Sequence, residues 1–162
     1  MNKKGQLSLS AILMFVIVIV VVSFIFLFTW EAFDGVSQDI KVDLAGNNES
    51  VAAIEEVENR YPPVFDSLIL VVFLGFWAAG IISAWMSDEH PMLFAFMMIL
   101  LIFVVIAAAM LGNFYEEIFT SGDLSTIPDT FPITNWIMSN LLIVTISIGL
   151  SILLAYIAKN QG

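Results

Sequence analysis

The chain has 162 residues, of which 60% are hydrophobic and 12% are charged, and its mean hydropathy is +0.97. Because soluble proteins are about 45–50% apolar, this composition excludes an ordinary soluble domain and indicates a membrane protein. There is no cysteine, so disulfides and thiolate chemistry are excluded. The formal charge of -10 comes from fifteen acidic and five basic residues, and their positions matter more than their sum.

Four uncharged runs are long enough to be membrane helices, which need about 17–25 residues to cross roughly 30 Å of hydrocarbon. The first run is rich in Val and Ile, a composition that would favour a buried strand in water. A bilayer requires internal backbone hydrogen bonding and therefore a helix. The predicted membrane helices cover residues 9–30, 67–86, 92–115 and 133–158.

The segment after the first run is predicted to form a helical hairpin. Apolar residues recur every three or four positions from Phe33 to Leu44, so the first helix continues out of the membrane. It would extend roughly 20 Å beyond the bilayer at about 1.5 Å per residue. The sequence "AGNNES" then breaks it, because Gly and consecutive Asn favour turns and Asn or Ser can cap a new helix. That second helix is predicted to stop at Pro62-Pro63.

The basic residues predict the orientation. Lys3, Lys4 and Lys159 flank the two chain ends. Four crossings place both ends on one side, which the positive-inside rule assigns to the cytoplasm or, in a virus, to the virion interior. The opposite side would carry the hairpin, Asp66 and a loop at residues 116–132, with thirteen acidic residues against two basic ones. Its "SGDLSTIPDTFP" sequence predicts an ordered loop or short helical turns.

Together these elements predict an all-α integral membrane protein with four transmembrane helices and a short extramembrane helical hairpin. We divide the chain into an N-terminal membrane helix at residues 1–30, an acidic hairpin at 31–65 and a three-helix membrane region at 66–162. The last region includes the external loop at 116–132.

The short segment "SDEHPM" joins the second and third membrane helices and holds the only histidine. Asp88, Glu89 and His90 carry groups that bind metals or relay protons. Three adjacent residues cannot all point to one centre, however, and no other His or Cys completes a site. Pro91 suits the first turn of the following helix, so we interpret the segment as an interhelical turn. A connection this short predicts that the second and third helices are antiparallel neighbours.

Transport and catalysis are not expected. Ionisable residues inside membrane helices commonly mark transport pathways, and the four runs contain none; Asp66, Glu116 and Glu117 lie at their edges, where water is expected. The loops lack a convergent nucleophile, base or metal set. We therefore expect no enzymatic activity, no cofactor and no nucleic-acid partner.

Small residues recur at four-residue spacing in the second and fourth membrane helices, and such stripes let helix backbones approach closely in lipid. Two interpretations remain open, which are packing within the chain and contact with another protomer. The residues are Gly75, Ala79 and Ser83 in the second helix and Ser147, Ser151 and Ala155 in the fourth.

Two short motifs concern processing. The sequence "NES" at Asn48 matches the N-glycosylation sequon on the predicted external side. The N-terminal "KKGQLSLS" before a hydrophobic run resembles the class III signal of archaeal pilins and archaellins, which implies cleavage between Gly5 and Gln6. The glutamate that many pilins carry five positions into the mature chain is Ser10 here. Since pilins have one membrane helix and a β-rich head, the resemblance concerns targeting and not pilin function.

The last part of the chain resembles small membrane proteins of tailless, membrane-containing bacterial and archaeal viruses. The resemblance rests on His90-Pro91, on "NFYEEI" at residues 113–118 and on "FPITNWIMSN" at residues 131–140. It implies a non-catalytic structural component of a viral internal membrane that contacts the capsid or neighbouring protomers. The alternatives are a holin-like oligomeric pore and an accessory subunit of a cellular membrane complex. The expected partners are the lipid bilayer, further copies of the chain and other membrane or capsid proteins.

Overall fold

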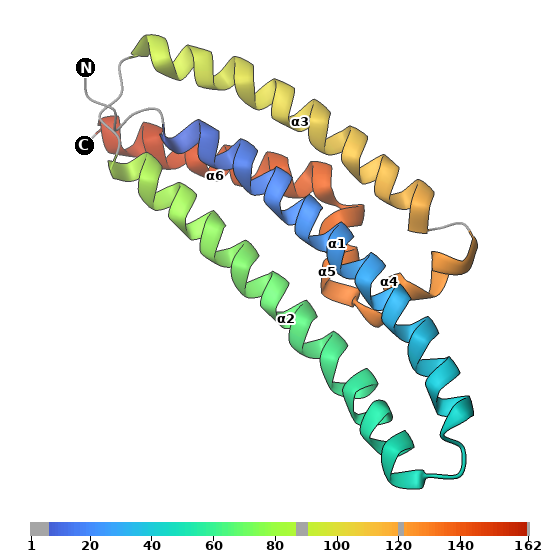
Figure 1. Ribbon diagram of the computed structural model, residues 1–162. Helices are drawn as coiled ribbons and strands as arrows, with labels where there is room; N and C mark the ends of the chain where they lie inside the picture. Colours follow the sequence, from blue (N-terminus) through green and yellow to red (C-terminus); the bar gives the residue numbers. More distant parts are fainter. Residues whose placement is uncertain (1–6, 87–90, 120–121, 162) are drawn as a thin grey trace.

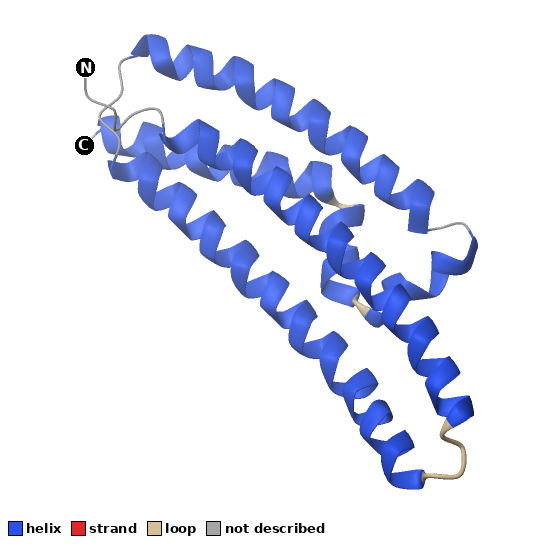
Figure 2. Cartoon of the chain, viewed as in Figure 1, coloured by secondary structure: helices blue, strands red, loops and turns tan. Residues whose placement is uncertain are grey.

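A computed structural model describes residues 7–86, 91–119 and 122–161, and this part of the chain is helical almost throughout, with no strand (Figures 1 and 2). The all-α prediction is therefore confirmed. The elements in chain order are α1 (Leu7–Asp43), α2 (Asn48–Met86), α3 (Pro91–Phe119), the 3-10 helix η1 (Gly122–Thr126), α4 (Ile127–Thr130), α5 (Pro132–Ser139) and α6 (Leu141–Gln161).

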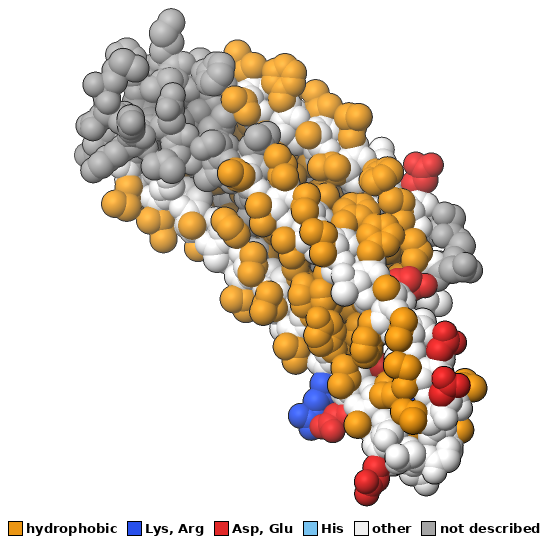
Figure 3. All heavy atoms as spheres, viewed as in Figure 1, with side chains coloured by type: hydrophobic (Ala, Val, Ile, Leu, Met, Phe, Trp, Pro, Cys, Tyr) orange, Lys and Arg blue, Asp and Glu red, His pale blue; other side chains and the backbone are white. Residues whose placement is uncertain are grey.

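Four of these helices, α1, α2, α3 and α6, are long and apolar enough to cross a membrane. Together with the composition, they make the chain an integral membrane protein. The start of α1 and the end of α6 lie at the same end of the bundle (Figure 1), as an even number of crossings requires. On the face shown in Figure 3, apolar side chains cover the body of the bundle, and acidic ones gather at the hairpin and beside the end of α3.

The hairpin is formed by the end of α1 and the start of α2, which project together beyond the other helices (Figure 1). As predicted, α1 continues without interruption out of the apolar run. The side-chain Oδ1 of Asn47 accepts a hydrogen bond from the Ser50 backbone N–H at 3.3 Å, so Asn47 caps α2.

The prediction that the second hairpin helix stops at Pro62-Pro63 is wrong, because α2 runs through both prolines to Met86. The prolines remove the N–H groups that would bond the carbonyls of Glu58 and Asn59. Those carbonyls lie in the charged half of α2, where water can bond them. Tyr61, between the charged half and the apolar half, stacks on Phe26 and Trp30 of α1, with ring centroids 5.7 and 5.8 Å apart, and this packing holds the helix across the proline pair.

The prediction of one helix over residues 133–158 is also wrong, because the chain breaks at Asn140 into α5 and α6. Both the backbone N–H and the side-chain Nδ2 of Asn140 donate to the Trp136 carbonyl, at 3.1 and 2.9 Å. An Asn side chain that competes for a backbone carbonyl in this way favours a turn. With 21 residues, α6 alone still measures about 31 Å, enough to cross the hydrocarbon layer.

The long helices form a four-helix bundle in which α1 packs on α2 and α3, and α6 packs on the same two helices. α2 and α3 are antiparallel, as predicted, but the prediction that they are neighbours in the bundle is wrong: they lie diagonally across it, with α1 and α6 between them (Figure 1). The short connection fixes only the distance between two helix ends. The interior is filled with apolar side chains, among them Ile19, Leu27, Ile69, Val104 and Ile148.

Two glycines mark where the helices approach most closely. A Cβ added at Gly80 of α2 would lie 2.8 Å from Cδ1 of Ile152 in α6, and one added at Gly149 of α6 would lie 2.5 Å from Cδ1 of Leu101 in α3. Both positions have a small, buried neighbour four residues away, Ala84 and Thr145. The close contacts of α6 with α2 and α3 therefore use small-residue pairs.

Candidate functional site

Several sequence-predicted sites fall at the edge of the described chain. Gly5 and Gln6, and likewise Asp88, Glu89 and His90, lie outside the described residues, so the processing and turn predictions for them stay predictions. α3 begins at Pro91. Asn48 is exposed as the first residue of α2, next to the hairpin turn. Over residues 7–86, 91–119 and 122–161, no three His, Cys, Asp or Glu side chains lie where they could hold a metal ion together.

The predicted small-residue stripes divide between the surface and the interior. Gly75, Ala79 and Ser147 are exposed, so their role in packing within the chain finds no support, and protomer contact stays a prediction for them. Ser83 is half-buried. The remaining two residues contribute to packing within the chain: the Ser151 hydroxyl accepts a hydrogen bond from Trp77 Nε1 at 2.9 Å, and Ala155 packs on the core.

A buried carboxylate is the feature that sequence reasoning missed. Asp66 was expected at a membrane edge in contact with water, but its exposed fraction is 3%. Its Oδ2 accepts a hydrogen bond from the Ile133 N–H, and its Oδ1 accepts from the Thr134 N–H and the Thr134 hydroxyl, all at 2.7 Å. The carboxylate of α2 therefore binds the first turn of α5.

The sequence at the start of α5 explains why this helix needs Asp66. Its first turn begins at Phe131, which has no side-chain acceptor, and continues with Pro132, which has no N–H. The next two N–H groups, of Ile133 and Thr134, have no partner within the helix. Asp66 satisfies both, and its negative charge lies at the positive end of α5. The residue thus acts as an N-cap supplied by another helix.

A second set of hydrogen bonds ties α3 to the same short helix. The buried Tyr115 of α3 donates its hydroxyl hydrogen to Oδ1 of Asn135 at 3.1 Å. The same oxygen accepts a hydrogen bond from the Ser139 hydroxyl, also at 3.1 Å. α5 is therefore held by α2 at its start and by α3 along its length. The buried side chains of Asp66 and Tyr115 thus each join α5 to another helix.

In the hairpin, Glu58 of α2 joins the two helices. Its carboxylate pairs with Lys41 of α1 and accepts a hydrogen bond from the buried Ser37 hydroxyl at 2.6 Å. Hydrogen bonds from Lys41 and then Ser37 hold the pKa of Glu58 below its ordinary value of 4.5. The other ion pair of the hairpin, between Arg60 and Glu56, lies within α2 and is exposed.

The depressed pKa of Glu58 predicts an acid-sensitive hairpin. A carboxyl whose pKa is lower in the folded state contributes stability above its unfolded pKa, and this contribution is lost as the pH falls through the folded-state value. We expect the wild-type chain to unfold at a higher temperature than Glu58→Gln at neutral pH, and the difference to vanish on acidification. Thermal unfolding of both chains between about pH 7 and pH 3, followed by circular dichroism, measures this. A difference that persists unchanged at the lowest pH would contradict the assignment.

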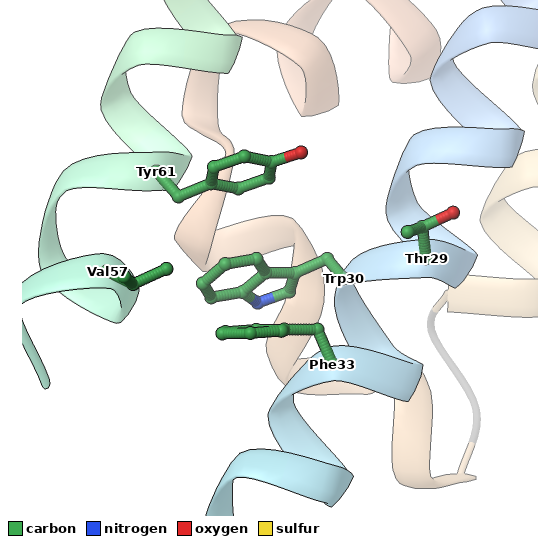
Figure 4. Close-up of a pocket in the computed structure, with 5 residues that line it drawn as sticks. All are labelled: Thr29, Trp30, Phe33, Val57 and Tyr61. Carbon is green, nitrogen blue, oxygen red and sulfur yellow. The ribbon is translucent and has the colours of Figure 1, made fainter. Parts of the chain in front are cut away.

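The hairpin also carries an apolar groove between its two helices. At its outer end the groove is lined by Phe33, Val36, Ser37 and Ile40 of α1 and by Ala53, Ile54 and Val57 of α2. It continues toward the bundle past Thr29, Trp30 and Tyr61, and Figure 4 shows this part, with the rings of Trp30 and Tyr61 stacked across it. We call this surface the hairpin groove.

Comparison with known proteins found no similar protein. No protein-family model, no curated protein and no solved structure matches the chain.

Proposed function

We propose that the chain is a non-catalytic structural protein of a membrane, which acts by assembling with other proteins. The observation that carries this proposal is that the buried Asp66 carboxylate binds the first turn of α5. A carboxylate buried next to membrane helices is a candidate for proton or ion transport. Here both of its oxygens are occupied by the first turn of α5, so its role is to hold the fold.

The packing of the bundle supports the same proposal. The interior of the four long helices is filled mainly by apolar side chains, with the buried hydroxyls of Ser23 and Thr145 among them, which favours a scaffold over a channel through a single chain. The acidic hairpin projects beyond the other helices and is available to partners on that side (Figure 1). With the lysine-flanked ends inside, this side faces outward.

We place this scaffold in the internal membrane of a tailless virus, with the hairpin facing the capsid. The support is the resemblance of the last hundred residues to small membrane proteins of such viruses, which rests on His90-Pro91 and on residues 113–118 and 131–140. The test is detection of the chain in purified, membrane-containing particles with an antibody against the hairpin. We expect it in intact particles and in their lipid fraction after the capsid is removed. Its absence from purified particles would overturn the viral location.

A holin-like pore is the second candidate. It is favoured by the exposure of Gly75, Ala79 and Ser147 on the uncharged stretches of α2 and α6, which leaves small-residue contacts free for an oligomer. Dye-loaded vesicles distinguish the two. For a scaffold we expect the reconstituted wild-type chain to release dye no faster than vesicles without protein. Leakage that grows with the amount of protein, and that Gly75→Leu abolishes, would establish the pore instead.

A further inference from the structure

The hairpin groove is an apolar surface on the part of the chain that projects beyond the membrane. Val36 and Val57, one from each helix, are 58% and 45% exposed, and Phe33 and Ile40 beside them are at least one-third exposed. In a segment surrounded by lipid, such exposure would be ordinary. Outside the membrane, a contiguous apolar surface of this kind marks a binding site.

The dimensions of the groove suit one face of a short helix. Beyond the predicted membrane helix, which ends at residue 30, its lining on α1 runs from Phe33 to Ile40, which is two turns of helix and about 10 Å. Both walls are helices whose apolar residues recur every three or four positions. An amphipathic helix binds such a groove through apolar residues at the same spacing.

The charge around the groove identifies the occupant. Residues 31–65 contain eight acidic and two basic residues, a net charge of -6. Both bases are already paired, Lys41 with Glu58 and Arg60 with Glu56. The pair of Glu56 and Arg60 lines a shallow depression that adjoins the groove at Val57 and Tyr61, so the negative charge comes from the other acidic residues of the hairpin. A second copy of the hairpin would bring the same negative charge and would be repelled, as would an anionic lipid surface.

We infer that the hairpin groove binds a basic amphipathic segment of a partner protein, with apolar side chains in the groove and Lys or Arg side chains attracted by the net negative charge of the hairpin. This inference rests on the proposed function in one respect, namely that the hairpin lies outside the membrane. It adds the chemistry of the partner. Complementary charge would speed the encounter and exclude acidic partners, while the apolar contact would set the lifetime of the complex.

The experiment uses the full chain in nanodiscs of zwitterionic lipid and a fluorescent model peptide as the probe. The peptide is about 15 residues long, with leucines on one helix face and lysines on its flanks. We expect the wild-type chain to bind it and the double variant Val36→Gln/Val57→Gln to bind about tenfold more weakly. The matched control is Val42→Gln, because Val42 is 76% exposed on the same hairpin and does not line the groove. Val42→Gln should bind the peptide as the wild type does. Binding of the peptide to lipid is the same for every variant, so differences between variants report binding to the protein.

Two further peptides test the parts of the inference separately. A shuffled peptide of the same composition lacks the apolar face, and a second peptide carries glutamates in place of the lysines. We expect both to bind at least about tenfold more weakly than the basic amphipathic peptide. We also expect the binding of the basic amphipathic peptide to weaken as the salt concentration is raised. Equal binding of the shuffled peptide would show that charge alone drives the binding, and would overturn the inference that the apolar groove is the binding site. Equal binding of the acidic peptide would overturn the assignment of a basic partner.

Two other outcomes would also overturn the inference. If the double variant retains full affinity, the peptide binds elsewhere. If the chain forms a dimer that the double variant loses, and the peptide does not bind, the groove belongs to a second copy. Failure here is distinguishable from failure of the proposed function, because the peptide assay does not depend on virions or on vesicle leakage. A chain that binds the peptide but is absent from virus particles keeps its partner chemistry and loses only the viral location.

Discussion

Replacement of Asp66 by alanine is expected to destabilise the chain more than any other single removal of a polar side chain in the described structure. The variant leaves the buried N–H group of Thr134 and the part-buried N–H group of Ile133 without acceptors; a fully buried group costs about 1–3 kcal/mol, and a part-buried one costs less because water can reach it. A total loss of about 2–4 kcal/mol corresponds to a decrease of roughly 5–15 °C in the unfolding temperature of a chain this size. Thermal unfolding in detergent micelles, followed by circular dichroism, measures the decrease.

Graded variants separate the cap from a general effect of charge. Thr134→Val keeps the backbone donors and removes only the hydroxyl that Asp66 accepts, so we expect a loss of about 1 kcal/mol. The matched control is Asp129→Ala, because Asp129 is an exposed acid in the neighbouring α4. It should unfold at the wild-type temperature. If Asp66→Ala behaved as Asp129→Ala does, the capping role would be wrong.

The large-scale architecture follows from hydrophobic length. A run of twenty or so uncharged residues must form a helix in a bilayer, whatever its strand propensity, because no water is present to bond the backbone. This physical constraint is strong enough to predict α1, α2, α3 and α6 from composition alone. The hairpin was also predictable, since the apolar period in residues 33–44 continues the first helix and Asn47 begins the next one.

Local interruptions were predicted less well, because they depend on what surrounds them. Pro62-Pro63 would end an isolated helix, but the stacking of Tyr61 on Phe26 and Trp30 keeps α2 continuous. The opposite error occurred at Asn140, where a single Asn inside a long apolar run ends α5 by donating its side-chain N–H to the Trp136 carbonyl. At the prolines tertiary contacts override the local propensity, and at Asn140 a local side-chain bond ends the helix within an apolar run.

The role of Asp66 was hidden for a different reason. The sequence does show a helix start without a capping side chain, at "FPIT", and it does show a single acid at the edge of the second apolar run. Nothing in one sequence says that two features 67 residues apart meet. The pairing depends on α5 lying against α2, and α5 became a separate helix only because of the break at Asn140. One missed turn thus concealed the buried carboxylate.

The sequence also does not show which small residues face the interior of the chain and which face outward. A pair of glycine variants distinguishes the two. Gly149→Leu places a side chain where an added Cβ already lies 2.5 Å from Leu101, so we expect a loss of about 1–3 kcal/mol in stability from overpacking. Gly75→Leu is the matched control, because nothing lies within 4 Å of a Cβ added there. It should leave the unfolding temperature of the isolated chain unchanged.

The same control tests the protomer contact that remains a prediction. If Gly75 packs against another copy, Gly75→Leu should shift the chain toward monomers in mild detergent while its unfolding temperature as a monomer stays the same. Light scattering with chromatography measures the oligomeric state. An unchanged distribution would remove Gly75 from any interface between copies. A small-residue stripe can serve packing inside the chain or contact between chains, and only variants that separate stability from association assign it.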